Sequence, residues 1–419
     1  MQRAVITGLG AITPIGLTVE EFWANLTAGI SGAGPITTFD TTDFVARIAC
    51  EVKDFDPRAY MDFKLAKRTH RATQFAIAAS QMALADAGLT VDENNETTVG
   101  VVMNTGGGGI GDMEEGAKMI LAKGPRSISP FFTPSAMPNA VSCLVSIASG
   151  AKGPVSTSTA ACASGNYAFL EALRLLRLEE ARVVITGGTE SAIFSLILAS
   201  LGRAGALSSR NEDPQRASRP FDKNRDGFVF GEGAAVMVVE MEEHARQRGA
   251  RIYAELAGGA ITGDAYHITA PDPQGDGAAR AMKLALENAS MAPEEIDCIF
   301  AHGTGTPLND AVETRAIKKV FGDYAYRLAV SATKSMVGHI MGAAGAISAL
   351  AAVLAIRDDI IPPTINYETP DPECDLDYVP NVARQQKVNA TLINGFGFGG
   401  QNVAVIIRKY ESQGSESPG

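Results

Sequence analysis

The strongest candidate for chemistry is Cys162, in the stretch STSTAACASGNYAFLEAL at 156–173. An apolar, strand-like run ends in a turn of small residues, and a helix is expected to begin directly after the cysteine. A thiol at a helix N-terminus meets unpaired backbone N–H groups and the positive end of the helix dipole, which both stabilise a thiolate. The alternative is a small buried core cysteine, which is common. The context favours a nucleophile and leaves the structural interpretation open.

His302 follows a second strand-like run and begins the glycine-rich stretch HGTGTPLNDAVE at 302–313. Loops that follow buried strands often carry chemistry, so His302 is a candidate site residue. The alternative is a turn histidine that is hydrogen-bonded to the backbone. In that case Asp310 and Glu313 are simply favourable charges in the first turn of a helix.

Lys334 and His339 interrupt the apolar, small-residue stretch SATKSMVGHIMGAAG at 331–345. Two titratable groups that enter a buried environment indicate tuned pKa values. The alternative is a structural ion pair, for example between Lys334 and Glu313. That pairing is compatible with a functional role as well.

Three glycine-rich stretches differ in what they predict. NGFGFGGQN at 394–402 indicates a mobile loop with an aromatic ring that could swing, or alternatively a tight connection between two strands. VITGLGAITPIG at 5–16 lacks the third glycine of a dinucleotide fingerprint. TGGGGIGD at 105–112 lacks the following GK[ST] of a phosphate-binding loop. No nucleotide cofactor is predicted.

Composition excludes several classes of protein. The net charge of −11 argues against a nucleic-acid binder. The five cysteines are scattered without CxxC or CxxH spacing, so we expect no metal site, no disulfide framework and a reducing, cytoplasmic location. The N-terminus lacks the layout of a signal peptide, and no apolar run reaches about 18 residues, so no membrane insertion is expected. The polar stretch 411–419 is predicted to be a disordered tail.

The elements that must position these residues alternate between strand and helix, which predicts an α/β architecture with buried sheets. Expected strands are 3–8, 97–103, 154–160, 182–187, 234–241, 251–257, 297–301, 328–332, 390–394 and 402–408. Expected helices are 18–28, 64–87, 163–178, 276–289, 309–321 and 342–357. The last helix is apolar nearly all round, as expected for a helix sandwiched between two sheets. The polar stretch 205–230 is predicted to be a long, ordered surface loop.

Motifs around these candidates resemble those of one family over about 1–410. They are GPVSTSTAACASG, SRPFDKNRDGFVFGEGA, HGTGTPLND, TKSMVGHIMGAAG and NGFGFGG. The chain resembles the β-ketoacyl-acyl-carrier-protein synthases of the elongating Cys-His-His type, with the synthase II type of fatty-acid synthesis as the best match. The resemblance implies a thiolase fold with two duplicated α/β halves, 1–255 and 256–410, in five layers, α-β-α-β-α. It also implies a homodimer, although a heterodimer with a related subunit stays open.

The resemblance implies a decarboxylative Claisen condensation. Cys162 would take an acyl chain from acyl carrier protein, and His302 and His339 would donate hydrogen bonds to the thioester carbonyl of malonyl-carrier-protein. The backbone N–H groups of Cys162 and Phe398 would form the oxyanion hole. Lys334, linked to Glu313, would support His302 electrostatically.

The same resemblance assigns the substrate path. Thr304, Thr306 and Thr269 match positions near the phosphopantetheine arm, and Phe398, followed by Gly399, matches a gate for the acyl chain. No bound cofactor is expected, because the substrates arrive on that arm.

Three positions depart from the family pattern. Gly107 replaces a bulky isoleucine of the acyl pocket, which predicts a longer or bulkier acyl chain in a polyketide-like or specialised lipid pathway unless Ile110 refills the space. Ser348 replaces a glutamate that helps to hold a monovalent cation, and Gly205 replaces an arginine of the carrier-protein patch, where Arg203 could compensate.

A basic stripe supports an acidic partner. Lys64, Lys67, Arg68 and Arg71 have the spacing of one helix face, and Arg126 could join them. Such a stripe on an acidic protein suits docking of an acidic carrier protein. The alternative is an ordinary solvated helix face.

Three other functions fit the sequence less well. A thiolase would need a second reactive cysteine near the C-terminus, and none follows Cys374. A non-catalytic chain-length subunit typically lacks the nucleophile, which is present here. A cysteine hydrolase would use one histidine oriented by Asn or Asp and would not need His339 beside Lys334.

Overall fold

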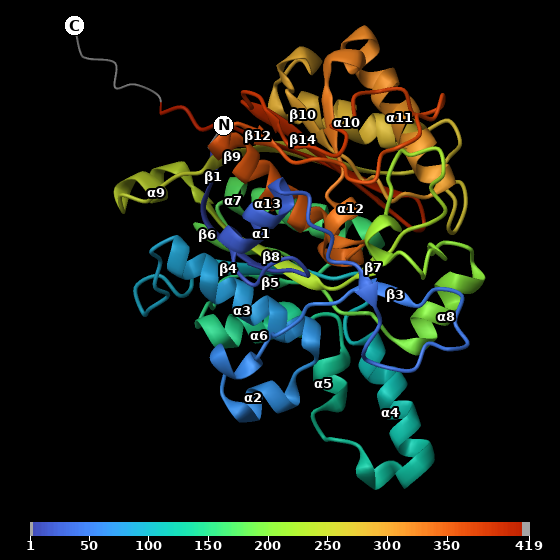
Figure 1. Ribbon diagram of the computed structural model, residues 1–419. Coiled ribbons are helices and arrows are strands. Elements are labelled where there is room, and N and C mark those ends of the chain that lie inside the picture. The colour runs from blue at the N-terminus through green and yellow to red at the C-terminus, as the bar shows by residue number, and fades with distance from the viewer. Residues whose placement is uncertain (1–2, 413–419) are drawn as a thin grey trace, which may run out of the picture.

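Ten strands form one hydrogen-bonded sheet in the computed structural model, which describes residues 3–412 (Figure 1). The first half contributes β1 (Ala4–Ile12), β4 (Val99–Asn104), β5 (Val155–Ser156), β6 (Val183–Glu190) and β8 (Gly233–Met241). The second half contributes β9 (Ala254–Gly263), β10 (Cys298–Phe300), β11 (Ala329–Ser331), β14 (Ala390–Gly397) and β15 (Gln401–Arg408). Each of the ten predicted strands is present. Of the predicted tail, 413–419 lies outside the described residues.

The two halves share one topology. The order is β5-β4-β6-β8-β1 in the first half and β11-β10-β14-β15-β9 in the second. In both, the second strand runs parallel to its two neighbours and the remaining pairs are antiparallel. The halves join where β1 pairs with β9, from Ala4 opposite Leu256 to Ile6 opposite Ala254. This repeated topology confirms the duplication that the resemblance implied.

Helices pack on the sheet in three layers (Figure 1). The outer helices of the first half are α3 (Arg71–Asp86) and α6 (Ala140–Ser149), and those of the second half are α10 (Asp276–Ala289) and α11 (Pro307–Phe321). The middle layer consists of α7 (Ser164–Arg177) and α13 (Ala344–Asp358). Each layer has its own apolar core. The arrangement is the predicted α-β-α-β-α order of the thiolase fold.

The central helix α13 explains a misleading apolar stretch. Met341–Asp358 is long and apolar enough to cross a membrane by length and composition, but 83% of it is buried inside the protein. Every residue from 344 to 356 is buried. A helix that is apolar all round suits a position between two sheet faces, as predicted.

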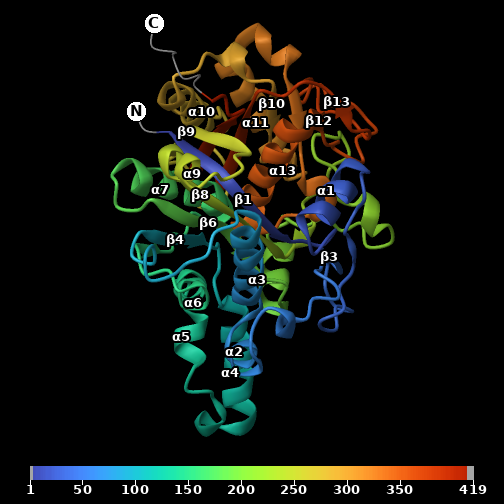
Figure 2. The same ribbon diagram turned by 90° about the vertical axis from the view of Figure 1, so that its left-hand side faces the viewer.

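The remaining elements connect these layers. The other helices are α1 (Val19–Thr27), α2 (Phe63–Arg68), α4 (Ile110–Lys123), α5 (Phe132–Ala136), α8 (Ser195–Arg203), α9 (Glu242–Gln247) and α12 (Lys334–Val337). Short strands β2 (Gly34–Pro35), β3 (Ile48–Cys50) and β7 (Phe230–Gly231) form one small sheet, and β12 (Ile360–Ile361) pairs with β13 (Arg384–Gln385). Figures 1 and 2 show that α4 and α5 project away from the main sheet.

One predicted helix is two. The expected helix at 64–87 breaks at Thr69 and His70, whose extended backbone ends α2 and begins α3. Arg71 therefore lies in a different helix from Lys64, and the predicted single basic stripe is wrong at that residue. The Arg71 guanidinium instead donates to Glu232 and to the carbonyl of Val52.

Candidate active site

Cys162 lies in a single 3₁₀ turn, Ala161–Ala163, between β5 and α7. Ala161 has a φ of +47°, a left-handed backbone that a residue with a Cβ adopts at some cost in strain. The second half repeats this turn at Met341–Ala343, where Met341 has a φ of +33°. Gly342 occupies the position that matches Cys162. A Cβ on Gly342 would lie 2.1 Å from the backbone nitrogen of Gly106, so only the first turn has room for a side chain.

Burial determines the protonation of the Cys162 thiol. The residue is 6% exposed, and burial raises the pKa of the Cys162 thiol to about 11. Lys334 and the backbone N–H groups of Phe398 and Cys162 act in the opposite direction. The prediction that the helix start favours a thiolate is therefore outweighed by desolvation. The thiol is therefore protonated at neutral pH.

His302 and His339 form a buried pair. Their ring centroids are 5.5 Å apart, with the rings at 86° to each other. Burial and the nearby Lys334 charge hold the pKa of each imidazole well below its usual range. Both rings are therefore neutral, and each carries one N–H donor. The Nδ1 atom of each ring is buried and has no hydrogen-bond partner among residues 3–412.

Two charged side chains hold the backbone of His302 from opposite sides. The Glu313 carboxylate accepts from the N–H groups of His302 and Gly303, both at 2.8 Å. The Lys334 ammonium donates to the His302 carbonyl at 2.5 Å. Lys334 and Glu313 do not form the direct ion pair considered from the sequence. Each side chain instead binds the backbone of His302, Glu313 at its N–H group and Lys334 at its carbonyl oxygen. Asn394 completes the clamp by donating to Glu313 at 3.0 Å.

The charge on Lys334 predicts a pH dependence. Burial lowers the pKa of Lys334 to about 8, against the opposing effects of Glu313, Cys162 and Asp310. Since the ammonium is the acidic form, its charge is lost as the pH rises through this value. We expect condensation to slow above about pH 8 in a pH–rate profile. The Lys334→Met variant should be slow and should lack this decline; a wild-type rate that stays constant or rises up to about pH 9 would contradict the assignment.

The glycine-rich segment after Asn394 is a tight hairpin. Gly397 pairs with Gln401, so Phe398, 42% exposed, lies in the turn between β14 and β15. Gly399 has a φ of +85°, which glycine adopts without strain. The alternative of a tight strand connection is thus what the backbone forms, with the Phe398 ring on its exposed side.

Glycines also bring this hairpin against the nucleophile. A Cβ on Gly397 would lie 2.3 Å from the carbonyl oxygen of Ala160, and one on Gly395 would lie 2.2 Å from Asn166 Oδ1. The backbone N–H groups of Phe398 and of Cys162 itself both lower the pKa of the Cys162 thiol, as donors near the sulfur do. An oxyanion hole uses two donors of this kind.

The predicted pantetheine threonines occupy two different segments. Thr304 is buried and its hydroxyl lies 2.9 Å from that of Thr306, which caps the N-terminus of α11. Thr269 is exposed on the loop after β9. That loop contacts the hairpin, because the Gly399 N–H donates to the Ile268 carbonyl at 2.8 Å.

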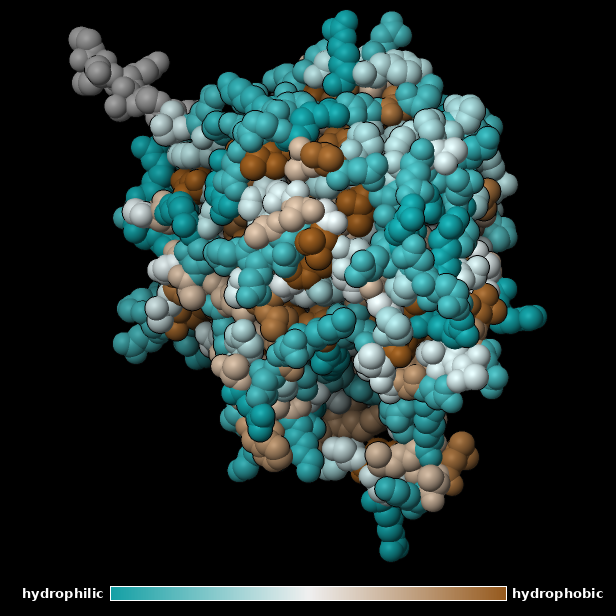
Figure 3. All heavy atoms as spheres, viewed as in Figure 1, coloured by the Kyte–Doolittle hydropathy of each residue, from teal (hydrophilic) through white to brown (hydrophobic). Residues whose placement is uncertain are grey.

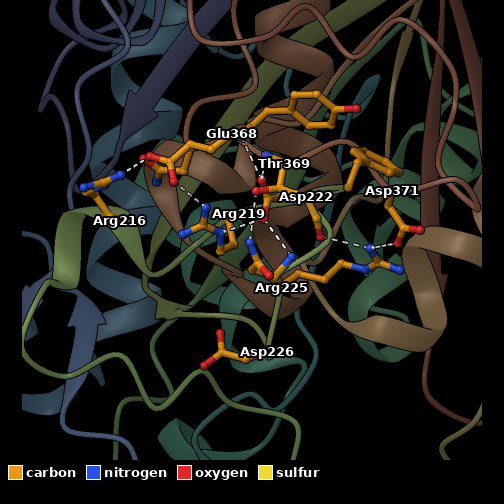
Figure 4. A network of polar contacts seen from close by, with 12 residues as sticks. Arg216, Arg219, Asp222, Arg225, Asp226, Glu368, Thr369 and Asp371 are labelled. Carbon is orange, nitrogen blue, oxygen red and sulfur yellow. Dashed lines mark hydrogen bonds and ion pairs between the residues drawn. The ribbon is translucent and has the colours of Figure 1, made fainter.

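A network of arginine and carboxylate side chains joins the segment 216–226 to the segment 368–371 (Figure 4), and Arg225 extends it to Asp310 at the start of α11. Asp310, which is fully buried, accepts from the N–H groups of Gly305 at 3.2 Å and Phe221 at 2.7 Å. The Arg225 guanidinium lies 3.8 Å from the same carboxylate. Asp310 is therefore a backbone anchor rather than only a charge at a helix start.

The same network ties 205–230 to the second half. Asp222 accepts from the N–H groups of Glu368 at 2.7 Å and Thr369 at 2.6 Å, and Arg219 donates to Asp222 at 3.1 Å. Asp222 and Arg219 are both buried. The predicted surface loop is ordered, but its centre is buried, so the surface assignment is wrong. The alternation of Arg and Asp is the sequence signal for such a network.

Comparisons with known proteins identify the family of this chain. The family model described as "Beta-ketoacyl synthase, N-terminal domain" matches residues 1–245, and "Beta-ketoacyl synthase, C-terminal domain" matches 253–368. The chain belongs to the beta-ketoacyl synthase family. The expected division between its halves, after residue 255, lies just inside β9.

Relatives of this synthase are similar over nearly their whole length. A 3-oxoacyl-[acyl-carrier-protein] synthase 2 of Synechocystis is 51% identical over 98% of this chain and 99% of the relative, and one of Coxiella burnetii is 49% identical over 97% and 99%. The solved ishigamide ketosynthase/chain length factor has a TM-score of 0.92 at 41% identity, covering 98% of this chain and 100% of that one. A type II polyketide ketosynthase in complex with its acyl-carrier protein, AntDE:AntF, has a TM-score of 0.91 at 35% identity with the same coverage.

The space beside Gly107, which the resemblance assigns to the acyl pocket, is occupied by Ile110. A Cβ on Gly107 would lie 3.1 Å from Ile110 Cγ2. Ile110 therefore occupies the space that glycine leaves, as the sequence allowed. Gly107 therefore gives no reason to expect a longer or bulkier acyl chain.

The remaining expectations for the synthase concern ions and charges. Among residues 3–412, no group of three or more His, Cys, Asp or Glu side chains is arranged to hold a metal ion. The Ser348 hydroxyl lies 3.0 Å from that of Thr333. Lys64, Lys67 and Arg68 are exposed on α2, and Arg126 is exposed in the turn after α4. Arg68 lies over the Phe131 ring at 4.2 Å, which brings α2 beside α5.

Proposed function

We propose that this synthase condenses an acyl chain held on Cys162 with malonyl-acyl carrier protein, giving 3-oxoacyl-acyl carrier protein and CO₂ in fatty-acid elongation. The observation that carries the proposal is the neutral pair His302 and His339 beside a buried thiol. Two neutral N–H donors suit a carbonyl that becomes an enolate, because they stabilise the developing negative charge.

The residues divide the reaction into two halves. The Cys162 thiol attacks the acyl thioester, the carrier's thiol leaves, and the N–H groups of Cys162 and Phe398 stabilise the oxyanion. Malonyl thioester then loses CO₂, while His302 and His339 hydrogen-bond the enolate oxygen. The enolate carbon attacks the acyl carbonyl, a carbon–carbon bond forms, and the Cys162 thiolate leaves and regains a proton.

Fatty-acid elongation is favoured over a polyketide-like pathway. The relatives at 49–51% identity are 3-oxoacyl-carrier-protein synthases, whereas the polyketide ketosynthase is 35% identical. The filled space above Gly107 also removes the reason to expect a bulkier chain.

The partner is acyl carrier protein, whose phosphopantetheine arm brings the substrates, so no resident cofactor is required. Exposed Lys64, Lys67, Arg68 and Arg126 offer a basic surface to an acidic carrier. The solved complex of a related ketosynthase with its carrier protein supports such a partner. A reducing, cytoplasmic location suits the five free cysteines.

A homodimer is supported by two exposed features. β5 is an edge strand of the sheet, and unpaired edges readily pair with another chain. The projecting α4–α5 segment carries exposed apolar side chains, visible at the bottom of Figure 3; they are Met113, Met119, Ile120, Leu121 and Phe131. Sedimentation of the purified chain would show the proposed dimer.

The reaction is tested by incubating the enzyme with acyl- and malonyl-carrier proteins and following both products by mass spectrometry. We expect an acyl adduct on Cys162 and a 3-oxoacyl product. Cys162→Ala should lose both. Cys143→Ala is the matched control, because Cys143 is the one cysteine among residues 3–412 that is not buried. An adduct that persists in Cys162→Ala would refute the mechanism.

A further inference from the structure

The run of four glycines at 106–109 binds an anion that belongs to the protein itself. Glu190 Oε2 accepts from the N–H groups of Gly106 at 2.8 Å and Gly107 at 3.3 Å, and the Thr105 hydroxyl donates to Glu190 Oε1 at 3.2 Å. Consecutive backbone N–H groups form a concave anion site. The segment that lacks the features of a phosphate loop is therefore a carboxylate-binding loop.

Burying the Glu190 carboxyl group at this place costs free energy. It is fully buried at the end of β6, and no Lys, Arg or His in the described part of the chain forms an ion pair with it. Burial raises the pKa of Glu190 to about 7, against the hydrogen bonds that favour its charged form. A further donor is the Gly342 N–H at 3.1 Å, from the turn that matches the nucleophile turn. The Glu190 carboxylate thus links the glycine loop of the first half to the Gly342 turn of the second half.

The glycine loop borders the nucleophile on one side and Ile110 on the other. A Cβ on Gly106 would lie 3.3 Å from the Ala161 carbonyl oxygen, beside Cys162, and one on Gly107 would lie 3.1 Å from Ile110 Cγ2. If an acyl chain on Cys162 ran along this loop, it would meet Ile110. A longer chain would then pass only if Ile110 and the loop backbone moved.

The residues that follow Glu190 hold the start of α4 as well. The Phe194 ring packs directly on Gly111, where any Cβ would overlap it. Glu114 accepts from the Leu196 N–H at 2.9 Å and from the Ser195 hydroxyl. With α4 fixed by these contacts, the loop before it is the part that can yield.

We propose that Glu190 is a positioning residue that holds the glycine loop closed and thereby sets the chain length at which Ile110 must give way. The inference rests on the proposed condensing function. Moving the loop breaks the hydrogen bonds of Gly106 and Gly107 to the Glu190 carboxyl group, so long chains are disfavoured relative to short ones. The Glu190 side chain acts through the loop and does not touch the reacting atoms.

The test is Glu190→Gln, which keeps the shape and removes the charge. Acylation of Cys162 is measured with hexanoyl- and hexadecanoyl-carrier protein, and amide hydrogen exchange is measured at 105–110. We expect the hexadecanoyl-to-hexanoyl rate ratio to rise about tenfold, as loss of a charge-assisted hydrogen bond allows. Exchange at Gly106 and Gly107 should become faster. An unchanged ratio, or an equal loss for both chains, would overturn the proposal.

Three variants make the outcome decisive. Ile110→Ala should shift the ratio in the same direction with no change in exchange at Gly106. Glu240→Gln removes another fully buried carboxylate, which is bonded to Arg248 and lies at the opposite end of β8 from Gly233, the partner of Glu190; it should change neither readout. Thr105→Val removes one donor to Glu190 and should give a smaller shift if Glu190→Gln fails to fold.

The exchange measurement separates this inference from the proposed function. It needs no acyl substrate. A wild-type enzyme that forms no adduct on Cys162 would refute the condensing function, whereas unchanged exchange at Gly106 and Gly107 in Glu190→Gln would refute the positioning role.

Discussion

Replacing His339 with alanine is expected to slow condensation by about a hundredfold to a thousandfold while Cys162 still takes up an acyl chain. The reason is the division of labour in the site. His339 is a neutral, buried imidazole beside His302, and in the proposed mechanism it donates where the malonyl carbonyl becomes an enolate. In that mechanism the first acyl transfer depends instead on the backbone N–H groups of Cys162 and Phe398.

The measurement separates the two half-reactions. Acyl adduct on Cys162 is quantified in a single turnover without malonyl substrate, and CO₂ release is measured with malonyl-carrier protein. His70→Ala is the matched control, because His70 is also a buried neutral imidazole, hydrogen-bonded to Thr73 in α3 and outside the site. If His339→Ala lost acylation and decarboxylation by the same factor, the assigned roles would be wrong.

Gly397→Ala should reduce acylation of Cys162 by about a hundredfold, because even a displacement of about 1 Å in a positioned group has an effect of this size. The new Cβ would lie 2.3 Å from the Ala160 carbonyl oxygen, which belongs to the nucleophile turn. Either the hairpin or the turn must shift. The Phe398 N–H then no longer meets the thiol.

Gly263→Ala provides the comparison for this variant. Gly263 is on β9 opposite Gln401, and a Cβ there would meet only the Gly400 oxygen at 4.0 Å. It should retain activity. Thermal melting of both variants shows whether Gly397→Ala is folded. A folded Gly397→Ala enzyme that acylates Cys162 at the wild-type rate would contradict the role given to the Phe398 N–H.

Strands were more predictable from the sequence than helices, for reasons visible in particular segments. β6 begins with four β-branched residues, VVIT, and β8 contains three valines after its first glycine, so both sequences favour a strand. α6, AVSCLVSIAS, has the same residue types, yet it is helical because it packs against α3 on the outer face. α4 contains two glycines, which weaken its helical pattern, and both allow a ring to pack closely.

The residues of the site were predictable because each lies in a short, distinctive motif next to a strand end. What they do to one another was less so. Glu313 reaches the backbone of His302 rather than Lys334, and this follows only from the path of α11. Glu190 lies 84 residues from Gly106 along the chain, and no local pattern marks it as the ligand of a glycine loop.

The paired turns at Cys162 and Gly342 have a consequence for the number of reactive centres. A fold made from two copies of one unit offers two equivalent places for a thiol. The place at Gly342 is closed by the glycine loop that borders Cys162. A Cβ on Gly342 would lie 2.1 Å from the backbone nitrogen of Gly106 in that loop. Converting Gly342 to cysteine would therefore not create a second catalyst; it would displace the wall of the existing one. The two halves therefore share one strand order, but only one of the two turns can carry a thiol. The close contact between Gly342 and Gly106 is the reason.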